Sequence, residues 1–201
     1  MPYAEDRARE YRLCRDCSLV YVPERHHLPE LQEKAEYDLH RNQPDDPAYR
    51  NFLSRLADPL RACLPEGAAG LDFGCGPGPA LAAMFREWGY EVATYDKFYA
   101  CHHEIFGRKY DFITATEVLE HLHRPGCELP RLFGRLEQGG ILGIMTKLVR
   151  NRKAFEKWHY KNDPTHICFF SRGTFEWLAV AWQARCEFIG DDVILVHKAG
   201  V

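Results

Sequence analysis

A glycine-rich loop between an apolar strand and a helix constrains the fold of this chain most strongly. The loop spans Asp72 to Gly78, has the sequence DFGCGPG, and precedes a helical apolar spacing over residues 80–88. Glycines let the backbone approach a ligand closely, and amides at a helix start can donate to that ligand. Such a loop can also serve chain reversal alone, so its meaning depends on the elements around it.

Strand and helix patterns alternate downstream of this loop, as in parallel α/β units. The patterns predict strands over residues 90–95, 112–115, 141–146, 186–189 and 193–197, and helices over residues 80–88, 129–136 and 174–184. The tight connection at residues 190–192 makes the last two strands antiparallel. The segment between the strands at 90–95 and 112–115 is too short for a further strand and helix, so one βα unit is abbreviated or replaced by a loop. Gly139-Gly140 predicts a turn before the strand at 141–146, and Ser171 is predicted to cap the helix at 174–184.

The first 45 residues differ in character from the rest. They are rich in charge, His and Pro, and short apolar clusters such as residues 19–22 suggest a hairpin or arm rather than a core. Asp46-Pro47 predicts a helix start, because Asp accepts from first-turn amides and Pro fits the first helical position. Pro59 is expected to kink or end that helix. We therefore predict an N-terminal appendage over residues 1–45 and a main domain over residues 46–201.

Composition excludes several classes of partner. The chain of 201 residues has 26 basic and 29 acidic residues and a formal charge of -3, which gives no electrostatic case for general nucleic-acid or membrane binding. A small-molecule substrate is the simpler expectation. No apolar run approaches the roughly 20 residues that span a bilayer, and the polar start lacks a signal peptide. We expect a cytoplasmic protein whose eight cysteines are reduced thiols.

Three features around the glycine loop indicate which ligand it holds. The spacing is G-x-G-x-G with Asp72 just before it, whereas a dinucleotide pyrophosphate prefers G-x-G-x-x-G and disfavours a carboxylate there. Asp96 closes the next strand, where its carboxylate can accept hydrogen bonds from both hydroxyls of a ribose. NAD also contains such a ribose, so this feature does not discriminate between cofactors by itself. The third feature is the stretch 111–121, a strand that passes directly into a short helix ending in Glu120-His121.

Together these residues resemble the class I S-adenosylmethionine-dependent methyltransferases, in particular the small-molecule group that includes the ubiquinone-biosynthesis methylases. The resemblance covers about residues 67 to 198. It implies a Rossmann-like α/β fold with a seven-stranded sheet, the last strand antiparallel, and S-adenosylmethionine as cofactor. It assigns Asp72, Gly74, Gly76 and Gly78 to the methionine part, Asp96 to the ribose, and Thr116 and Glu117 to the wall beside the transferring methyl. The short segment 97–110 departs from the family pattern, so adenine contacts stay unassigned.

The acceptor side is predicted from the segment after the strand at 141–146. That segment emerges at the carboxyl edge of a parallel sheet, where ligands bind. Asp163 and His166 are predicted to line the acceptor site, with His166 as the base or acceptor-positioning residue and His121 beside the cofactor. The alternatives are that Asp163 caps a turn, that His166 is structural and that His121 is a helix C-terminal cation. Tyr37 and His40 are candidates for a lid.

Cys14 and Cys17 form the one cysteine pair that is spaced as a unit. A C-x-x-C turn presents two thiolates to a tetrahedral metal, and the pair resembles half of a zinc ribbon. A closed zinc site needs about four ligands. Zinc therefore requires recruitment of Cys101, of His102 or His103, of His26 or His27, or of a partner chain, and the alternative is a reduced vestigial knuckle.

The predicted function is methyl transfer to a small-molecule acceptor that the sequence does not name. The cofactor supplies the reactivity of an in-line displacement, so the protein mainly aligns the groups, and no catalytic triad is expected. Two alternatives stay open, a methyltransferase-like binding protein without turnover and, on weaker grounds, an NAD-dependent oxidoreductase. Formation of S-adenosylhomocysteine separates the first alternative from an enzyme.

Overall fold

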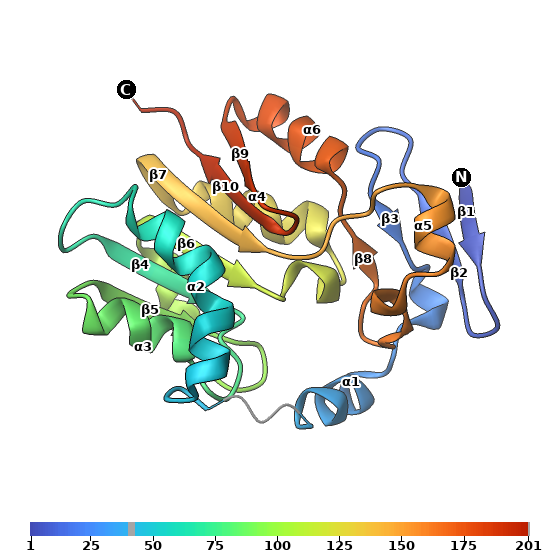
Figure 1. Cartoon of the computed structure of the whole chain (residues 1–201), viewed down its shortest axis with the longest axis horizontal. Coiled ribbons are helices and arrows are strands. Elements are labelled where there is room, and N and C mark those ends of the chain that lie inside the picture. Colours follow the sequence, from blue (N-terminus) through green and yellow to red (C-terminus); the bar gives the residue numbers. More distant parts are fainter. Residues whose placement is uncertain (40–42, 201) are drawn as a thin grey trace.

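The structure, a computed structural model, describes residues 1–39 and 43–200. Its centre is a sheet with the strand order β5-β4-β6-β7-β10-β9 (Figure 1). The strands are β4 (Ala69–Phe73), β5 (Glu91–Tyr95), β6 (Tyr110–Thr116), β7 (Leu136–Met145), β9 (Arg185–Ile189) and β10 (Val193–His197). The first four of these pair in parallel, and β10 pairs antiparallel with both β7 and β9. The predicted Rossmann-like α/β fold and its antiparallel last strand are confirmed.

The described part of this sheet has six strands rather than the seven that the family resemblance implied. Only the 3-10 helix η2 (His103–Gly107) lies between β5 and β6. Its Ile105 and Phe106 are buried in the core. The segment between β5 and β6 was predicted to be an abbreviated βα unit. It forms a short helical turn that packs into the core and adds no strand to the sheet.

Helices cover both faces of the sheet, as expected where parallel strands are joined by crossovers. One face packs against α2 (Pro47–Arg61) and α3 (Ala80–Glu87), and the other against α4 (Pro125–Gly134) and α6 (Arg172–Trp182). Successive side chains of a strand point to opposite faces. In β6, accordingly, Phe112 joins the cluster of α2 and α3 while Ile113 joins that of α4 and α6.

Two predicted helix starts are confirmed, and of the two effects expected of Pro59, a kink or a helix end, the helix end is wrong. Asp46 Oδ1 accepts the amide of Ala48 at 2.8 Å, and Ser171 Oγ accepts the amide of Thr174 at 3.1 Å. Pro59 does not end α2, which continues to Arg61. Because Pro59 lies in the last turn, the helix loses a single internal hydrogen bond near its end and needs no break.

The glycine pair at 139–140 forms an irregular part of β7 rather than the predicted turn. Tyr110 pairs with Leu136 while Phe112 pairs with Ile141, so β7 accommodates extra residues between these pairs. Gly139 has a φ of 76°, a left-handed conformation that glycine adopts without strain. The strand therefore begins earlier than its apolar run, which starts at Ile141.

The N-terminal residues form a second sheet that includes a strand from the far end of the chain. Its order is β1-β2-β3-β8, with β1 (Pro2–Glu5), β2 (Glu10–Leu13), β3 (Val20–Tyr21) and β8 (Cys168–Phe169). In the chain, β3 is followed by η1 (Glu24–His26) and α1 (Glu30–Tyr37). Figure 1 shows β1, β2, β3 and β8 beside α5 (Arg152–Glu156), at the opposite end of the molecule from β4 and β5.

The predicted hairpin is present, but the expectation that these residues lie outside a core is wrong. Tyr11, Val20 and Val22 are at most 2% exposed. The Tyr11 ring packs edge-on against Phe155 at 5.0 Å between centroids, and it also contacts the ring of Phe169. Tertiary packing against α5 and β8 creates this core, which the isolated N-terminal segment does not reveal.

A buried arginine fixes the N-terminal sheet to the segment that follows η4 (His159–Asn162). The Arg9 guanidinium donates to the carbonyl oxygens of Lys161, Asp163 and Pro164 at 2.5, 2.7 and 3.0 Å. Lys161 Nζ in turn contacts Asp6 Oδ2 at 2.6 Å. The N-terminal sheet therefore sets the path of the chain just before His166.

Replacing Arg9 tests this connection. We expect Arg9→Leu to lower the free energy of unfolding by about 2 to 4 kcal/mol, because it leaves several backbone carbonyls without their charged donor. Urea unfolding followed by far-UV circular dichroism measures the change. The matched control is Arg7→Leu at an exposed position of the same sheet, expected to fall within about 0.5 kcal/mol of the parent. Equal stability of the two variants would contradict the assignment.

Candidate active site

The glycine loop is held open at the carboxyl ends of β4 and β5. Tyr95 O accepts the amides of Gly74 and Cys75 at 2.7 and 3.1 Å. Gly74 and Gly76 have φ values of 75° and 63°, in the left-handed region that favours glycine. An added Cβ at Gly74 would lie 2.3 Å from Val118, whereas at Gly76 it would meet no atom within 4 Å. The loop thus leaves open space above Gly76, as a cradle for a bound ligand requires.

Asp96 organises the same loop. Its Oδ2 accepts the amide of Gly76 at 3.0 Å, and its Oδ1 accepts the amides of Phe98 and Tyr99 at 2.8 and 3.1 Å. A carboxylate oxygen can accept more than one hydrogen bond, so Oδ2 retains capacity for a further donor. The predicted ribose role of Asp96 therefore fits its position, and the residue also holds the loop in shape.

Asp72 lies under the loop with its side chain against the neighbouring strand. Its Oδ1 accepts from Thr114 Oγ1 at 2.9 Å, and only 4% of the residue is exposed. Burial raises the pKa of Asp72 to about 6. Gly78 is also buried, next to the first turn of α3. The cofactor role predicted for both residues stays a prediction, and the geometry makes the contribution of Asp72 an indirect one.

The raised pKa of Asp72 gives a pH-dependent prediction. The unfolded carboxyl titrates near about 3.9, so the native state loses stability as pH rises from about 4 to 6 and does not regain it above. Asp72→Asn removes this loss, because the amide does not titrate. Between pH 4.5 and pH 7.5 we therefore expect the free energy of unfolding of the variant to rise by about 2 kcal/mol relative to that of the parent.

Urea unfolding of the cofactor-free protein at both pH values measures this gain. Asp58→Asn is the matched control, because Asp58 is exposed on α2 and its replacement should leave the pH dependence of the parent unchanged. If Asp72→Asn differs from the parent by the same free energy of unfolding at both pH values, burial does not raise the pKa of Asp72.

The carboxyl end of β6 carries two features of a ligand site. Thr116 Oγ1 is buried and has no hydrogen-bond partner among residues 1–39 and 43–200, which calls for a group that the protein itself does not supply. Glu117 has a φ of 52°, a strained conformation for a residue with a side chain, and its amide donates to Met145 O at 2.8 Å. Both features fit the predicted wall beside the transferring methyl.

Glu120, the carboxylate that follows Glu117 in η3 (Leu119–His121), is fully buried. It accepts from Thr146 Oγ1 at 2.9 Å and forms a short hydrogen bond with the hydroxyl of Tyr160. Burial and the proximity of Glu120 raise the pKa of Glu117 to about 8. Two carboxyl groups with limited access to water therefore lie at the end of β6.

His121 and His166 meet beside Glu120, although 44 residues separate them in the chain. We call Glu120, His121 and His166 the Glu120 cluster; one ligand atom of each lies within 4.8 Å of the others. The imidazole rings of His121 and His166 are 4.7 Å apart between centroids. Burial and the neighbouring His121 lower the pKa of His166. Of the three candidates His121, Asp163 and His166, the structure thus brings two together: His166, predicted on the acceptor side, and His121, predicted beside the cofactor.

Asp163, the third, mainly holds a turn. Its Oδ1 accepts from the amide and the hydroxyl of Thr165 at 2.8 and 2.5 Å, the arrangement of the structural alternative. Its Oδ2 lies 3.7 Å from His166 Nε2, so it still faces the Glu120 cluster. An acceptor-side role for Asp163 stays a prediction.

Sequence reasoning missed Glu120, Thr146 and Lys147 as site residues. Glu120 directly precedes His121 inside an apolar stretch, where a carboxylate is rarely placed without a partner, and this signal was available. Thr146 and Lys147 follow the buried end of β7. No local signal distinguishes them from ordinary residues after a strand.

A cavity of about 430 Å³ is lined by, among others, Lys147, Trp158, Arg55 and Asp192. Lys147 and Arg55 favour the ionised form of Glu117 and so oppose the rise of its pKa. The Lys147 ammonium lies 5.1 Å from the centroid of the Tyr160 ring. Lys147 therefore connects the lining of this cavity with Glu117 and with Tyr160, although neither of these two residues lines it.

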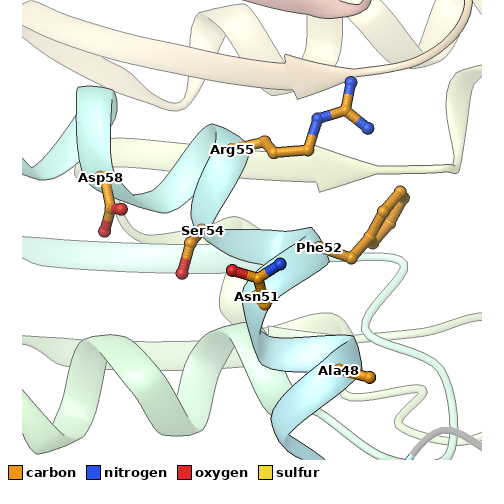
Figure 2. Close-up of a pocket in the computed structure, with 6 residues that line it drawn as sticks. All are labelled: Ala48, Asn51, Phe52, Ser54, Arg55 and Asp58. Atoms are coloured by element: carbon orange, nitrogen blue, oxygen red, sulfur yellow. The ribbon is translucent and has the colours of Figure 1, made fainter.

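A second hollow, of about 450 Å³, lies on α2 and contains no residue of the glycine loop or the Glu120 cluster. Figure 2 shows Phe52 and Arg55 leaving α2 on the same side. Arg55 lines both cavities and forms an ion pair with Asp192. Of the two hollows, we favour the one lined by Lys147 and Asp192 as the approach to the site, because both of these side chains act electrostatically on Glu117.

Helix α1 approaches both halves of the site. Tyr37 donates its hydroxyl to Glu33 at 2.9 Å, and its ring lies 5.2 Å from His121 and 5.8 Å from Phe98. Tyr37 thus lies between the loop after β5 and η3, the position that the lid hypothesis requires. His40 lies outside the described residues.

Cys14 and Cys17 are both free thiols. In residues 1–39 and 43–200 no third His, Cys, Asp or Glu joins them in a group that could hold a metal ion. The further ligands on which the zinc prediction depended are thus not found within the chain as described, and zinc at this pair stays a prediction that requires a partner chain.

A comparison with models of protein families shows the family to which this chain belongs. A family model described as a methyltransferase domain matches residues 37–184. This chain belongs to that family. It is an S-adenosylmethionine-dependent methyltransferase, as the sequence resemblance implied. No curated protein sequence matches it.

Solved structures of other methyltransferases share the fold. The 1,6-didemethyltoxoflavin-N1-methyltransferase of Burkholderia thailandensis, solved with 1,6-didemethyltoxoflavin and S-adenosylhomocysteine, is 18% identical with a TM-score of 0.55, covering 98% of this chain and 99% of that one. DesVI of Streptomyces venezuelae is 15% identical with a TM-score of 0.53, covering 87% and 100%. Human N-acetylserotonin methyltransferase, solved with S-adenosylmethionine, is 16% identical with a TM-score of 0.51, covering 73% and 51%. At these identities the likeness concerns the fold.

No helix within the described residues of the methyltransferase is long and apolar enough to cross a bilayer.

Proposed function

We propose that this methyltransferase acts on a hydroxyl group of a small-molecule acceptor, bound between the glycine loop and the Glu120 cluster. The observation that carries the proposal is a set of three groups that can take up a proton: Glu117, Glu120 and His166. They lie at the same edge of the sheet as the glycine loop. A hydroxyl nucleophile must lose its proton on methylation, so such groups are needed beside it. A bound S-adenosylmethionine supplies the electrophilic methyl group.

The residues of this chain bind and align the reactants. The Gly74 to Gly78 loop and Asp96 would hold the cofactor, and the unpartnered hydroxyl of Thr116 would complete the wall beside it. The acceptor would enter through the cavity lined by Lys147 and Trp158. Trp158 offers a planar surface, and Lys147 a positive charge for an acceptor that carries or develops negative charge. Tyr37 in α1 would limit access of water from the other side.

Cofactor binding tests the first half of the proposal. We expect Gly76→Val to weaken S-adenosylhomocysteine binding at least about tenfold, because the side chain would enter the open space above the loop and is strained at a positive φ. Isothermal titration calorimetry measures the affinity. The matched control is Gly126→Ala in α4, which also has open space around an added Cβ and should bind as the parent does. Unchanged affinity of Gly76→Val would place the cofactor elsewhere.

Turnover tests the second half. We screen phenols and alcohols for release of S-adenosylhomocysteine, and with any active acceptor we expect Glu117→Gln to lower kcat by about 10- to 100-fold while cofactor affinity stays the same, since a carboxylate beside the reacting group is lost. Lys153→Gln in the exposed helix α5 is the control. Cofactor binding without product from any acceptor would favour the non-catalytic binding protein, and methylation of amines or thiols alone would contradict the hydroxyl assignment.

A further inference from the structure

We infer that Glu120, His121 and His166 form a binding site for one divalent transition-metal ion. The site lies outside the C-x-x-C pair, and its three residues come from η3 and from the segment after η4. In the described part of the chain it is the one group of three His, Cys, Asp or Glu side chains whose ligand atoms converge.

The separation of the ligand atoms suits a metal. Bonds from zinc to imidazole nitrogen and carboxylate oxygen are about 2.0 to 2.2 Å long, so ligand atoms around one ion lie roughly 3 to 4 Å apart. In this structure the three atoms lie within 4.8 Å of one another. The longest of these separations thus exceeds the range expected around one ion by at most about 1 Å.

The surroundings of the two imidazoles match those of metal-binding histidines. His166 Nδ1 lies 2.7 Å from the carbonyl of Tyr160, and His121 Nδ1 lies 3.2 Å from the carbonyl of Thr165. A carbonyl only accepts, so each Nδ1 carries the proton and the ring lone pair is on Nε2. This second hydrogen bond to a backbone carbonyl is how proteins orient histidine ligands.

Glu120 is oriented by a comparable outer layer. Its carboxylate accepts from Tyr160 and Thr146, so Tyr160 orients one ligand through its carbonyl and another through its hydroxyl. The Tyr160 and His166 rings are also in contact, 4.2 Å apart between centroids. One residue thus couples the position of the carboxylate to that of an imidazole.

The charge balance around Glu120 favours a cation. Glu120 is 0% exposed, its hydrogen-bond donors are neutral hydroxyls, and it forms no ion pair with a lysine or arginine in residues 1–39 and 43–200. Asp163, whose Oδ2 lies 3.7 Å from His166 Nε2, adds further negative charge, whereas Glu117, with its raised pKa, is mostly neutral near pH 7. A buried carboxylate without a cation is costly, and a divalent ion held by Glu120 removes that cost.

The ligand set selects the class of metal. Imidazole nitrogen favours Zn²⁺, Co²⁺ or Fe²⁺, whereas Ca²⁺, Mg²⁺ and Mn²⁺ prefer oxygen ligands. Three protein ligands leave at least one coordination position open. On the proposed function, and resting on it, the acceptor hydroxyl would occupy that position, where the metal makes it more acidic, and its proton would pass to the ionised form of Glu117. His166 would then position the acceptor through the metal instead of taking the proton itself.

Co²⁺ titration of the full chain, freed of metal by dialysis against a chelator, tests the inference. We expect one Co²⁺ per chain, with visible d–d absorption and two paramagnetically shifted imidazole N–H resonances in the proton NMR spectrum. Glu120→Gln, His121→Ala and His166→Ala should each weaken binding at least about tenfold, in proportion to the loss of one ligand. His102→Ala, at an exposed position before η2, is the matched control and should bind as the parent does.

The double variant Cys14→Ser with Cys17→Ser separates the two possible metal positions. Under the inference it retains Co²⁺ binding, and no thiolate-to-cobalt absorption appears in the parent. The inference is overturned by absence of Co²⁺ binding, by loss of binding in the double cysteine variant, or by unchanged affinity in the three cluster variants. It is also overturned if the parent protein shows no shifted imidazole resonances at saturating Co²⁺. In that case a protonated His166, rather than a metal ion, would balance the charge of Glu120.

Two readouts keep this inference distinct from the proposed function. S-adenosylhomocysteine binding by calorimetry reports whether each cluster variant is folded, and the imidazole resonances of the parent test the site even if a variant does not fold. Turnover of a hydroxyl acceptor by metal-free protein would overturn the metal inference alone. Metal binding at the cluster without turnover of any hydroxyl acceptor would overturn the proposed function alone.

Discussion

The parallel pairing of β4 with β5 and β6 is the constraint on which the whole site depends. Because these strands run in one direction, Asp72, Asp96 and Glu117, at or just beyond the ends of three different strands, are brought to the same edge of the sheet. The hydrogen bond from the Gly76 amide to Asp96 then joins two of these ends directly. Without this register the glycine loop would have no carboxylate to hold it open.

The opposite side of the site depends on the N-terminal sheet. Arg9 fixes the carbonyls of the segment between η4 and His166, and β8 pairs with β3 directly after that segment. His166 thus reaches Glu120 and His121 from a chain segment that is held at both ends. The N-terminal residues therefore hold in place the segment that carries His166, although none of them belongs to the Glu120 cluster.

Much of the central sheet could be predicted from the sequence, because its signals are local. The strand before Asp72, the short segment between β5 and β6, the Ser171 cap and the tight turn before β10 each depend on residues close together in the chain. Where prediction was wrong, distant residues decided. Tyr11 becomes a core residue only against Phe155 and Phe169, and the glycine pair at 139–140 becomes part of β7 because β6 and the chain after β10 pair beside it.

By itself, the sequence determined the family of this protein and the candidate cofactor loop, since the glycine spacing, Asp72 and Asp96 follow one another within 25 residues and encode a local backbone conformation. Only the tertiary structure decided which side chains meet at the candidate acceptor side. It placed His166 within reach of Glu120 and His121, and it assigned Asp163 to a turn. The physical reason is that glycine conformations and helix caps depend on neighbours in the chain, whereas burial and ligand convergence depend on how separate segments pack.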